Sequence, residues 1–377
     1  MIYVAIGVYL GIVAFYFESR FFRLSLALLF LFFGLDYLNG YDWINYYHHY
    51  EAATVRDLLS VQSFIYEGSV GFSLILASAK LLGSYQYVFV ISSLVFVICL
   101  ARFCRLFRSK NLALFMCYSF YGYFYFIERV KQGLAIAIVL FGYELLRRGF
   151  RWRFLASVAL ATVFHPSAFV AAALASLPLE GARKKWSLIY GVFFCALGFL
   201  LISAIIFIPS VSANVPVVSL YVSKYSDLIR SNFNVLFFVS VGGISFLLVL
   251  ALLLRMATKA GSLRVSQQAF LVYFFTYITN VFYGMIRVMN YFYVVVIEAS
   301  VKFSEERSRF SLLRSLVFVI AAIQLVRPLA SKLYMDSILD YQIWGVSSRT
   351  PSQMEYLRCR ALFADSVDTD WADKTCQ

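Results

Sequence analysis

The sequence predicts an all-α membrane protein of about twelve transmembrane or re-entrant helices. Apolar residues make up 62% of the 377 residues and charged residues only 14%, against roughly 45–50% and 25% in soluble domains. Hydrophobic runs recur along almost the whole chain, and the basic residues gather in short segments between them. A soluble fold could not cover this much apolar surface.

The basic residues follow a membrane pattern rather than a nucleic-acid-binding one, although the net charge is +13. Most of the 33 lysines and arginines stand in short clusters between hydrophobic runs, for example Arg102–Lys110 and Arg147–Arg153. Positive loops stay in the cytoplasm, so these clusters place both ends of the chain on the outer side of the membrane. Nucleic acid is not expected as a partner.

The hydrophobic runs predict helices that cross or enter the membrane. They cover residues 2–17, 24–38, 85–101, 111–126, 131–146, 155–179, 187–208, 234–254, 266–284, 288–303 and 311–326. The first run lacks a basic start and a small-residue cleavage site, which favours a span over a signal peptide. Residues 1–326 would form a transmembrane domain with an outer-face loop over 39–84, and residues 327–377 an outer, periplasmic tail.

Two segments admit a second interpretation. As one span, Leu155–Leu179 would move the basic cluster Arg183–Lys185 to the outside, so we divide it at His165–Pro166 into two short helices that form a re-entrant pair. Proline at the first turn of a helix fits this division. Residues 66–83 carry charges near both ends and serines between them, which favours an amphipathic helix on the outer face over a span.

The stretch Gly40–Tyr50 is polar and aromatic and follows two hydrophobic runs. Aromatic residues at this depth commonly anchor a protein at the membrane interface, which would explain Trp43 and Tyr46. That interpretation does not account for Asp42 and Asn45. The alternative is a sugar-facing loop in which Asp42 serves as a general base.

The run Glu128–Gln132 is expected to open a helix at the outer face. Arg129 and Lys131 oppose the helix dipole, which favours anions at a helix N-terminus. An anionic ligand would remove this conflict, because the free N–H groups and the cations would both point at it. Alternatively, the cations reach the membrane interface while Glu128 offsets one of them.

Further polar residues stand within hydrophobic runs. His165 either packs at its turn or serves as an acid, a base or a phosphate hydrogen-bond donor, since the reference pKa of histidine lies near neutrality. A stripe that normally faces a bundle interior or a wet cavity consists of Thr276, Asn280, Tyr283 and Arg287. Interhelical hydrogen bonds would explain its first members, whereas the planar fork of Arg287 suits phosphate oxygens.

The tail from Arg327 onward nearly balances its basic residues with acids. Its aromatic residues could close over a substrate or plug the bundle equally well; they are Tyr334, Tyr341 and Trp344. Cys359 and Cys376 would lie outside, where a disulfide is allowed.

The charged and titratable candidates all fall at the predicted outer face; they are Asp42, Arg129, Lys131, His165, Arg287 and Arg327. Such a cluster suits an anionic lipid headgroup that enters from the bilayer. The sequence has no P-loop, GxGxxG, HExxH or Cys/His metal spacing, and His48 and His49 have no third ligand nearby in the sequence. We therefore expect no metal, no cofactor and no soluble nucleotide-sugar donor.

Several motifs, taken in order, resemble those of the EpsG family, a group of Wzy-type polysaccharide polymerases. The matching segments are Gly40–Tyr46, Glu67–Gly68, Lys131–Ala137, Phe164–Ala168 and Arg287 with Tyr291–Phe292. Gly40–Tyr46 is similar to the family's Gly-x-Asp-aromatic-x-Asn-Tyr loop, and Glu67–Gly68 with the helix after it to the next family element. The three later segments are similar, in order, to an Arg-Gln-x-Leu-Ala run, a Phe-His-x-Ser-Ala turn and an Arg…Tyr-Phe element. This chain departs from the pattern at Lys131, where the family commonly has Arg, and at Asp36, where it often has Arg.

The resemblance implies a GT-C-like glycosyltransferase in the bacterial cytoplasmic (inner) membrane, with its active site facing the periplasm. Such enzymes join oligosaccharide repeat units carried on undecaprenyl pyrophosphate into O-antigen, capsule or exopolysaccharide. Pyrophosphate would be held by Arg129, Lys131, Gln132 and Arg287, and Asp42 or His165 would orient or deprotonate the acceptor hydroxyl. Sugar or cavity contacts would come from Trp43, Asn45, Tyr46, Asn280, Tyr283, Tyr291 and Arg327. The sequence leaves open a chain-length regulator protein as a further partner.

Other classes of protein remain as alternatives. A flippase for the same lipid-linked sugars would need basic residues deep in several helices, whereas here they gather at the outer ends. A ligase that moves finished glycan to another lipid would share the donor site, and only the family resemblance separates it from a polymerase. A structural subunit of an export complex would not need charged helix ends.

Overall fold

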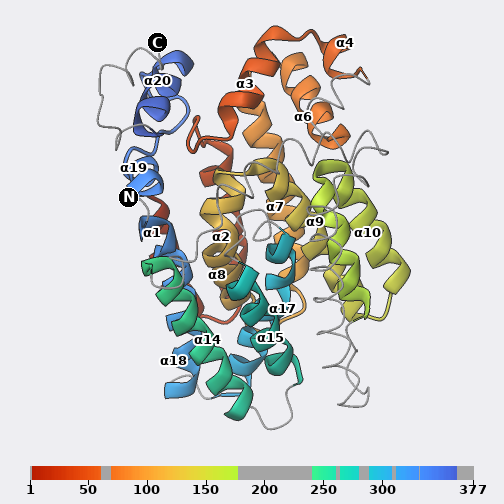
Figure 1. Ribbon diagram of the computed structural model, residues 1–377, viewed down its shortest axis with the longest axis vertical. Coiled ribbons are helices and arrows are strands. Elements are labelled where there is room, and N and C mark those ends of the chain that lie inside the picture. The colour runs from red at the N-terminus through yellow and green to blue at the C-terminus, as the bar shows by residue number, and fades with distance from the viewer. Residues whose placement is uncertain are drawn as a thin grey trace, which may run out of the picture. The chain divides into compact units, whose positions relative to one another are not determined.

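The computed structural model describes residues 2–60, 69–176, 240–259, 264–279, 288–307, 311–330 and 332–362 (Figure 1). Within these ranges the regular structure is helical, with no strand and one isolated β-bridge. The predicted all-α class is therefore confirmed. The helix expected over 187–208 lies outside the described residues.

The described ranges contain both α-helices and short helices of other types. In chain order they are α1 (Ile2–Tyr16), α2 (Phe22–Gly34), α3 (Trp43–Ala52), α4 (Val55–Leu58), α6 (Val70–Leu81), α7 (Gln86–Cys104), α8 (Lys110–Tyr121), the π-helix η1 (Gly122–Ile127), α9 (Val130–Arg147), α10 (Arg151–Phe164), the 3₁₀-helix η2 (Pro166–Ser176), α14 (Val241–Lys259), α15 (Arg264–Thr279), η4 (Asn290–Phe292), α17 (Tyr293–Glu305), α18 (Leu312–Val326), η5 (Arg327–Ala330), α19 (Lys332–Leu339) and α20 (Pro351–Leu362).

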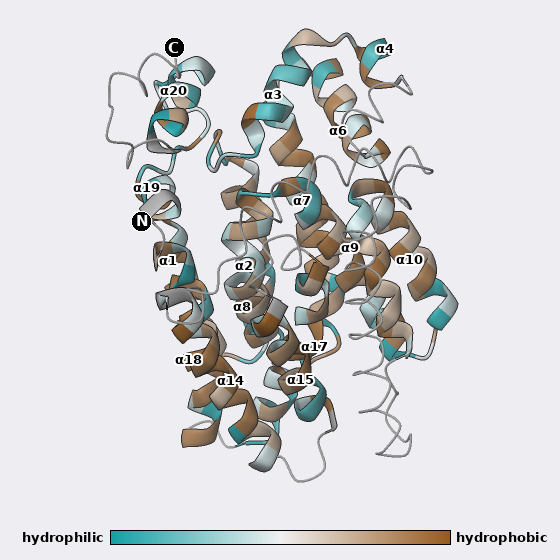
Figure 2. Ribbon diagram, in the orientation of Figure 1, coloured by the Kyte–Doolittle hydropathy of each residue, from teal (hydrophilic) through white to brown (hydrophobic). Residues whose placement is uncertain are grey.

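Two described helical segments are long and apolar enough to cross a membrane, namely Gln86–Cys104 and Leu312–Ala330. Several shorter apolar helices accompany them, among them α1, α2 and α6. Figure 2 shows hydrophobic residues along most of these helices, with polar residues concentrated near α3, α4 and α20. This pattern fits a membrane protein, while the number of spans and the outer position of the chain ends stay predictions.

The chain forms two compact units. The first comprises residues 1–144, 159–166 and 321–377, and the second residues 145–158 and 167–320. In the first unit α2 packs along α7 and α1 along α8, and in the second α15 packs between α14 and α17 (Figure 1). The second unit buries Glu298, whose carboxylate binds the side chains of Arg147 at 2.6 Å and Lys302 at 3.0 Å.

The expected loop after Asn39 is wrong for residues 43–52, which form helix α3. Trp43 and Tyr50, two turns apart on this helix, are both buried. Tyr, His and Asn are only moderate helix formers, so propensity alone gives little signal. Packing of one aromatic face stabilises the helix instead.

The predicted break at His165–Pro166 is confirmed, because α10 ends at Phe164 and the 3₁₀-helix η2 begins at Pro166. Proline has no N–H to continue a helix and disfavours helical geometry in the residue before it.

The segment 66–83 contains the expected helix, α6, which Ser69 caps by accepting the Phe72 N–H at 3.1 Å. That α10 and η2 form a re-entrant pair, and that α6 lies on the outer face of the membrane, stay predictions.

The tail returns to the first unit and pairs with the segment that follows α2. Asp36 and Ile343 form an antiparallel bridge, and the Trp344 N–H donates to the Leu35 carbonyl at 2.9 Å. The Asn39 side chain donates to the Gln342 carbonyl at 2.8 Å and accepts the Gln342 N–H at 2.9 Å. This part of the tail is therefore an integral layer of the fold.

Asp36 gives the protein a pH-dependent stability. Burial raises the pKa of its carboxyl group to about 8, although the Asn39 side chain and Arg358 act in the opposite direction. The folded protein keeps a proton that the unfolded chain releases above about pH 4, so stability falls as the pH rises towards 8. Asp36→Asn should remove the part of this fall that Asp36 causes and leave the part due to Glu128, whose pKa burial also raises to about 8; the melting temperature in detergent across that pH range measures the difference.

Asp340→Asn is the control, because this half-exposed carboxylate pairs with Arg349 at the surface of the tail. It should keep the wild-type dependence of melting temperature on pH. An Asp36→Asn protein with that same dependence would contradict the prediction.

Candidate functional site

A π-helix leads into the charged turn that precedes α9. In η1 the hydrogen bonds skip one residue more than in an α-helix, and the Glu128 N–H donates to the Tyr123 carbonyl at 2.9 Å. The charged run opens the helix as expected: Glu128 and Arg129 form the turn, and α9 starts at Val130, one residue before the predicted start at 131. Single π turns are frequent at functional sites.

Gly133 lets α9 approach this π-helix closely. A Cβ atom at Gly133 would collide with the carbonyl oxygen of Tyr125. The colliding atom belongs to the backbone, which cannot rotate aside as a side chain can. The glycine in the Lys131–Ala137 run therefore fixes how the start of α9 sits against η1.

Lys131 joins three helices of the first unit. Its side chain is only 9% exposed, and its Nζ lies 4.2 Å from the ring centre of Tyr46 on α3 and 5.1 Å from that of Phe72 on α6. The two rings pack edge to face at 4.8 Å. Partly desolvated contacts between a cation and aromatic faces are favourable, so the charge is held at this junction. Its neighbours Arg129 and Gln132 are buried as well.

Glu128 faces the segment that contains Asp42. Gly40 has a φ angle of +79°, and a Cβ atom there would lie 2.5 Å from Glu128 Oε2, so only glycine fits. The Tyr41 N–H donates to the Glu128 carboxylate. Burial raises the pKa of Glu128 to about 8, and the nearby Asp42 carboxylate raises it further against the lowering effect of Arg129. The neutral form of the Glu128 carboxyl group is therefore favoured close to the side chain of Asp42.

The sequence pattern indicated only that Glu128 offsets one of the neighbouring positive charges. It gave no sign that the Glu128 carboxyl group lies near that of Asp42. Asp42 stands at the N-cap position of α3, yet its side chain makes no capping hydrogen bond. A carboxylate in this position normally caps its helix. Its failure to do so leaves the Asp42 carboxylate available to another group.

The turn at His165 lies close to the start of α6. The ring of Phe164 approaches Gly71 so closely that a Cβ atom there would lie 2.8 Å from it. The next residue, Phe72, is the one that contacts Lys131. His165 is partly exposed, and the three segments 71–72, 131 and 164–165 thus belong to one region of the first unit.

Other predicted site residues lie in varied places. Trp43 is buried and donates its indole N–H to the Gly40 carbonyl at 3.2 Å, whereas Asn45 is exposed. The Arg327 guanidinium stacks 5.5 Å from the ring centre of Phe124 in η1. In the second unit Tyr291 is buried, with its hydroxyl 3.2 Å from that of Ser167. Asn280, Tyr283 and Arg287 lie outside the described residues.

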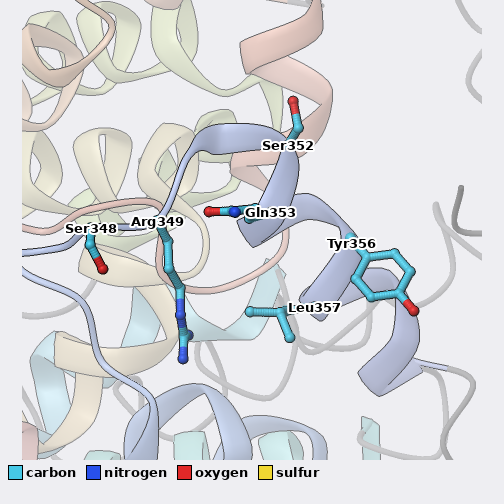
Figure 3. A pocket seen from close by; sticks show the side chains of 6 residues that line it. All are labelled: Ser348, Arg349, Ser352, Gln353, Tyr356 and Leu357. Carbon is cyan, nitrogen blue, oxygen red and sulfur yellow. The ribbon is translucent and has the colours of Figure 1, made fainter.

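A surface pocket of about 640 Å³ lies on the tail, apart from the predicted site residues. Figure 3 shows its lining residues, which are Ser348, Arg349, Ser352, Gln353, Tyr356 and Leu357. Arg349 is already paired with Asp340. Within the described ranges, no group of three or more His, Cys, Asp or Glu residues is arranged to hold a metal ion.

The EpsG family model matches residues 19–343 of the chain. The match includes the Gly40–Tyr46 segment, the turn at Glu128, the start of α9 and the His165 turn. Searches of curated proteins and of solved structures found no match.

Gly133→Ala should destabilise the protein, because the added Cβ atom meets a backbone oxygen that cannot move without disturbing η1. Overpacking of this kind costs about 1–3 kcal/mol or more. The melting temperature in detergent measures the effect. Gly34→Ala is the control, since its Cβ atom would meet only ordinary contacts, 3.7 Å from Ser93. Equal melting of both variants would show that α9 and η1 are not in close contact.

Proposed function

Because the chain belongs to the EpsG family, we propose that it is an integral membrane glycosyltransferase that polymerises oligosaccharide repeat units linked to undecaprenyl pyrophosphate. The family is one of Wzy-like polysaccharide polymerases. The reaction would take place on the outer, periplasmic face of the bacterial cytoplasmic membrane.

The observation that carries this proposal is the junction between α9 and α3. Lys131 contacts Tyr46, and in the adjacent turn Glu128 interacts with both Asp42 and Arg129. Cations suited to a pyrophosphate and a carboxylate suited to a sugar hydroxyl therefore lie in one region. A glycosyl transfer from a lipid pyrophosphate needs both groups close together.

The chemistry follows from these roles. The acceptor hydroxyl oxygen forms a bond to the anomeric carbon of the donor sugar, while the bond from that carbon to the pyrophosphate oxygen breaks. The electron pair leaves with undecaprenyl pyrophosphate, whose developing charge Arg129 and Lys131 would stabilise. The hydroxyl proton passes to Asp42 or His165. Gln132 and Arg287 would add donors to the leaving group, and tyrosines such as Tyr46 would flank the sugar.

Two features support an outer position for this site. Arg102, at the end of α7, pairs at 3.3 Å with Glu144 near the C-terminal end of α9. The basic cluster that starts at Arg102 therefore lies at the end of α9 opposite the site, and the positive-inside rule favours an inner position for that cluster. Cys359 in the tail is disulfide-bonded, and disulfides persist in oxidising compartments such as the periplasm. Cys376 lies outside the described residues.

The glycan ladder of cells that lack this gene tests the function. We expect single repeat units in the deletion strain and long chains when the intact gene is restored. Long free or lipid-linked polymer in the deletion strain would indicate a ligase instead. Lipid-linked units trapped on the cytoplasmic side would indicate a flippase.

Lys131→Met should lower the rate of chain growth by roughly a hundredfold, because a preorganised charge at the leaving group is lost. Lys131→Arg should restore long chains, since it keeps the charge and matches the residue common in the family. The same rescue assay measures both variants at equal protein level.

Lys80→Met is the control for Lys131. Lys80 also lies over a tyrosine ring, that of Tyr50, at 4.9 Å, but stands at the far end of α6. It should support chains of wild-type length. Normal chain growth in Lys131→Met cells would remove Lys131 from the site.

A further inference from the structure

Arg358 is a buried cation that the sequence pattern did not assign to the site. It lies on α20, beyond residue 343 where the family match ends. The side chain is 2% exposed, and its Nε and Nη2 atoms have no hydrogen-bond partner in the part of the chain that the structure describes. A buried arginine with unpaired donors is costly, so a missing acceptor is the simplest physical account.

The neighbours of Arg358 belong to the site already described. Its guanidinium carbon lies 6.0 Å from the ring centre of Tyr41, and its charge acts on the carboxyl groups of Glu128 and Asp36. Burial raises the pKa of both acids to about 8, more than the nearby cations lower it. Burial therefore favours the neutral form of both acids, and neither forms a hydrogen bond with the Nε or Nη2 atom of Arg358.

The position of α20 is fixed from two sides. Met354, one turn before Arg358, is fully buried. The Glu355 carboxylate lies 2.7 Å from Nε2 of His48 on α3, the helix that begins next to Asp42. Arg358 is thus presented by a helix that is attached to α3.

We propose that Arg358 is a further oxyanion-binding residue of this site. Its side chain binds phosphate oxygens of the lipid-linked substrate together with Arg129 and Lys131 at the start of α9. This inference rests on the proposed function. The planar guanidinium suits paired phosphate oxygens, and Arg129 supplies a second cation next to Glu128. Burial is the main cause that raises the pKa of Tyr41 to about 12, so its hydroxyl remains protonated and adds a donor.

Binding of two probes to the purified full-length protein tests the proposal. The probes are undecaprenyl pyrophosphate in lipid nanodiscs and inorganic pyrophosphate, each titrated while the melting temperature is recorded. Arg358→Met should weaken binding by about 10- to 100-fold, as expected for the loss of charge-assisted hydrogen bonds. Arg360→Met, an exposed arginine on the same helix, should bind as the wild type does.

The two probes separate the sources of the phosphate. Weakened binding of both would show that Arg358 recognises the pyrophosphate group itself, and weakened binding of the lipid alone would show that it needs the lipid-linked form. Either result supports the proposal. Wild-type affinity in Arg358→Met, or no binding of either probe by the wild type, would overturn it.

Arg358→Lys covers the case in which the methionine variant does not fold. Lysine keeps the positive charge but lacks the paired N–H donors of the planar guanidinium group, so we expect binding of both probes to be about tenfold weaker. Wild-type affinity in Arg358→Lys would overturn the proposal. The glycan ladder separates this inference from the proposed function. If binding depends on Arg358 but deletion of the gene leaves chain growth unchanged, the binding site stands and the polymerase function fails.

Discussion

The site depends on one close contact, that between Gly40 and Glu128. Gly40 adopts a left-handed conformation and leaves no space for a side chain beside the Glu128 carboxylate. The Tyr41 N–H completes the contact by donating to that carboxylate. Because Glu128 also belongs to the turn that starts α9, the contact sets where Asp42 lies relative to the cations that follow Glu128. Together with the contact between Lys131 and Tyr46, it joins the segment after α2 to the start of α9.

Burial determines the charge of this region. Taking a carboxyl group out of water favours its neutral form, and Glu128 and Asp36 both respond in this way. Arginine keeps its proton under the same conditions. A set of acids and bases that looks balanced in the sequence therefore becomes cationic once folded, which suits an anionic ligand better than the formal charges indicate.

Local patterns in the sequence predicted the all-α class, the break before Pro166 and the charged turn before α9, because each depends on neighbouring residues. The helix α3 was missed because its stability comes from burying Trp43 and Tyr50 rather than from propensity. The role of Glu128 was missed for a related reason, since its burial comes from Gly40, far away in the chain. A sequence pattern carries no signal for such contacts, and the same holds for Arg358 on a polar tail helix.

The pairing of the tail with the segment after α2 has a consequence for biogenesis. Asn39 exchanges hydrogen bonds with Gln342, 303 positions later in the chain. Membrane proteins are threaded into the bilayer while they are made, so the groups around Asp36 remain without these partners until the chain has been synthesised past residue 342. The contacts that join Asn39 to the tail therefore form only after the helices between these two positions have been made, so this layer of the first unit is assembled late.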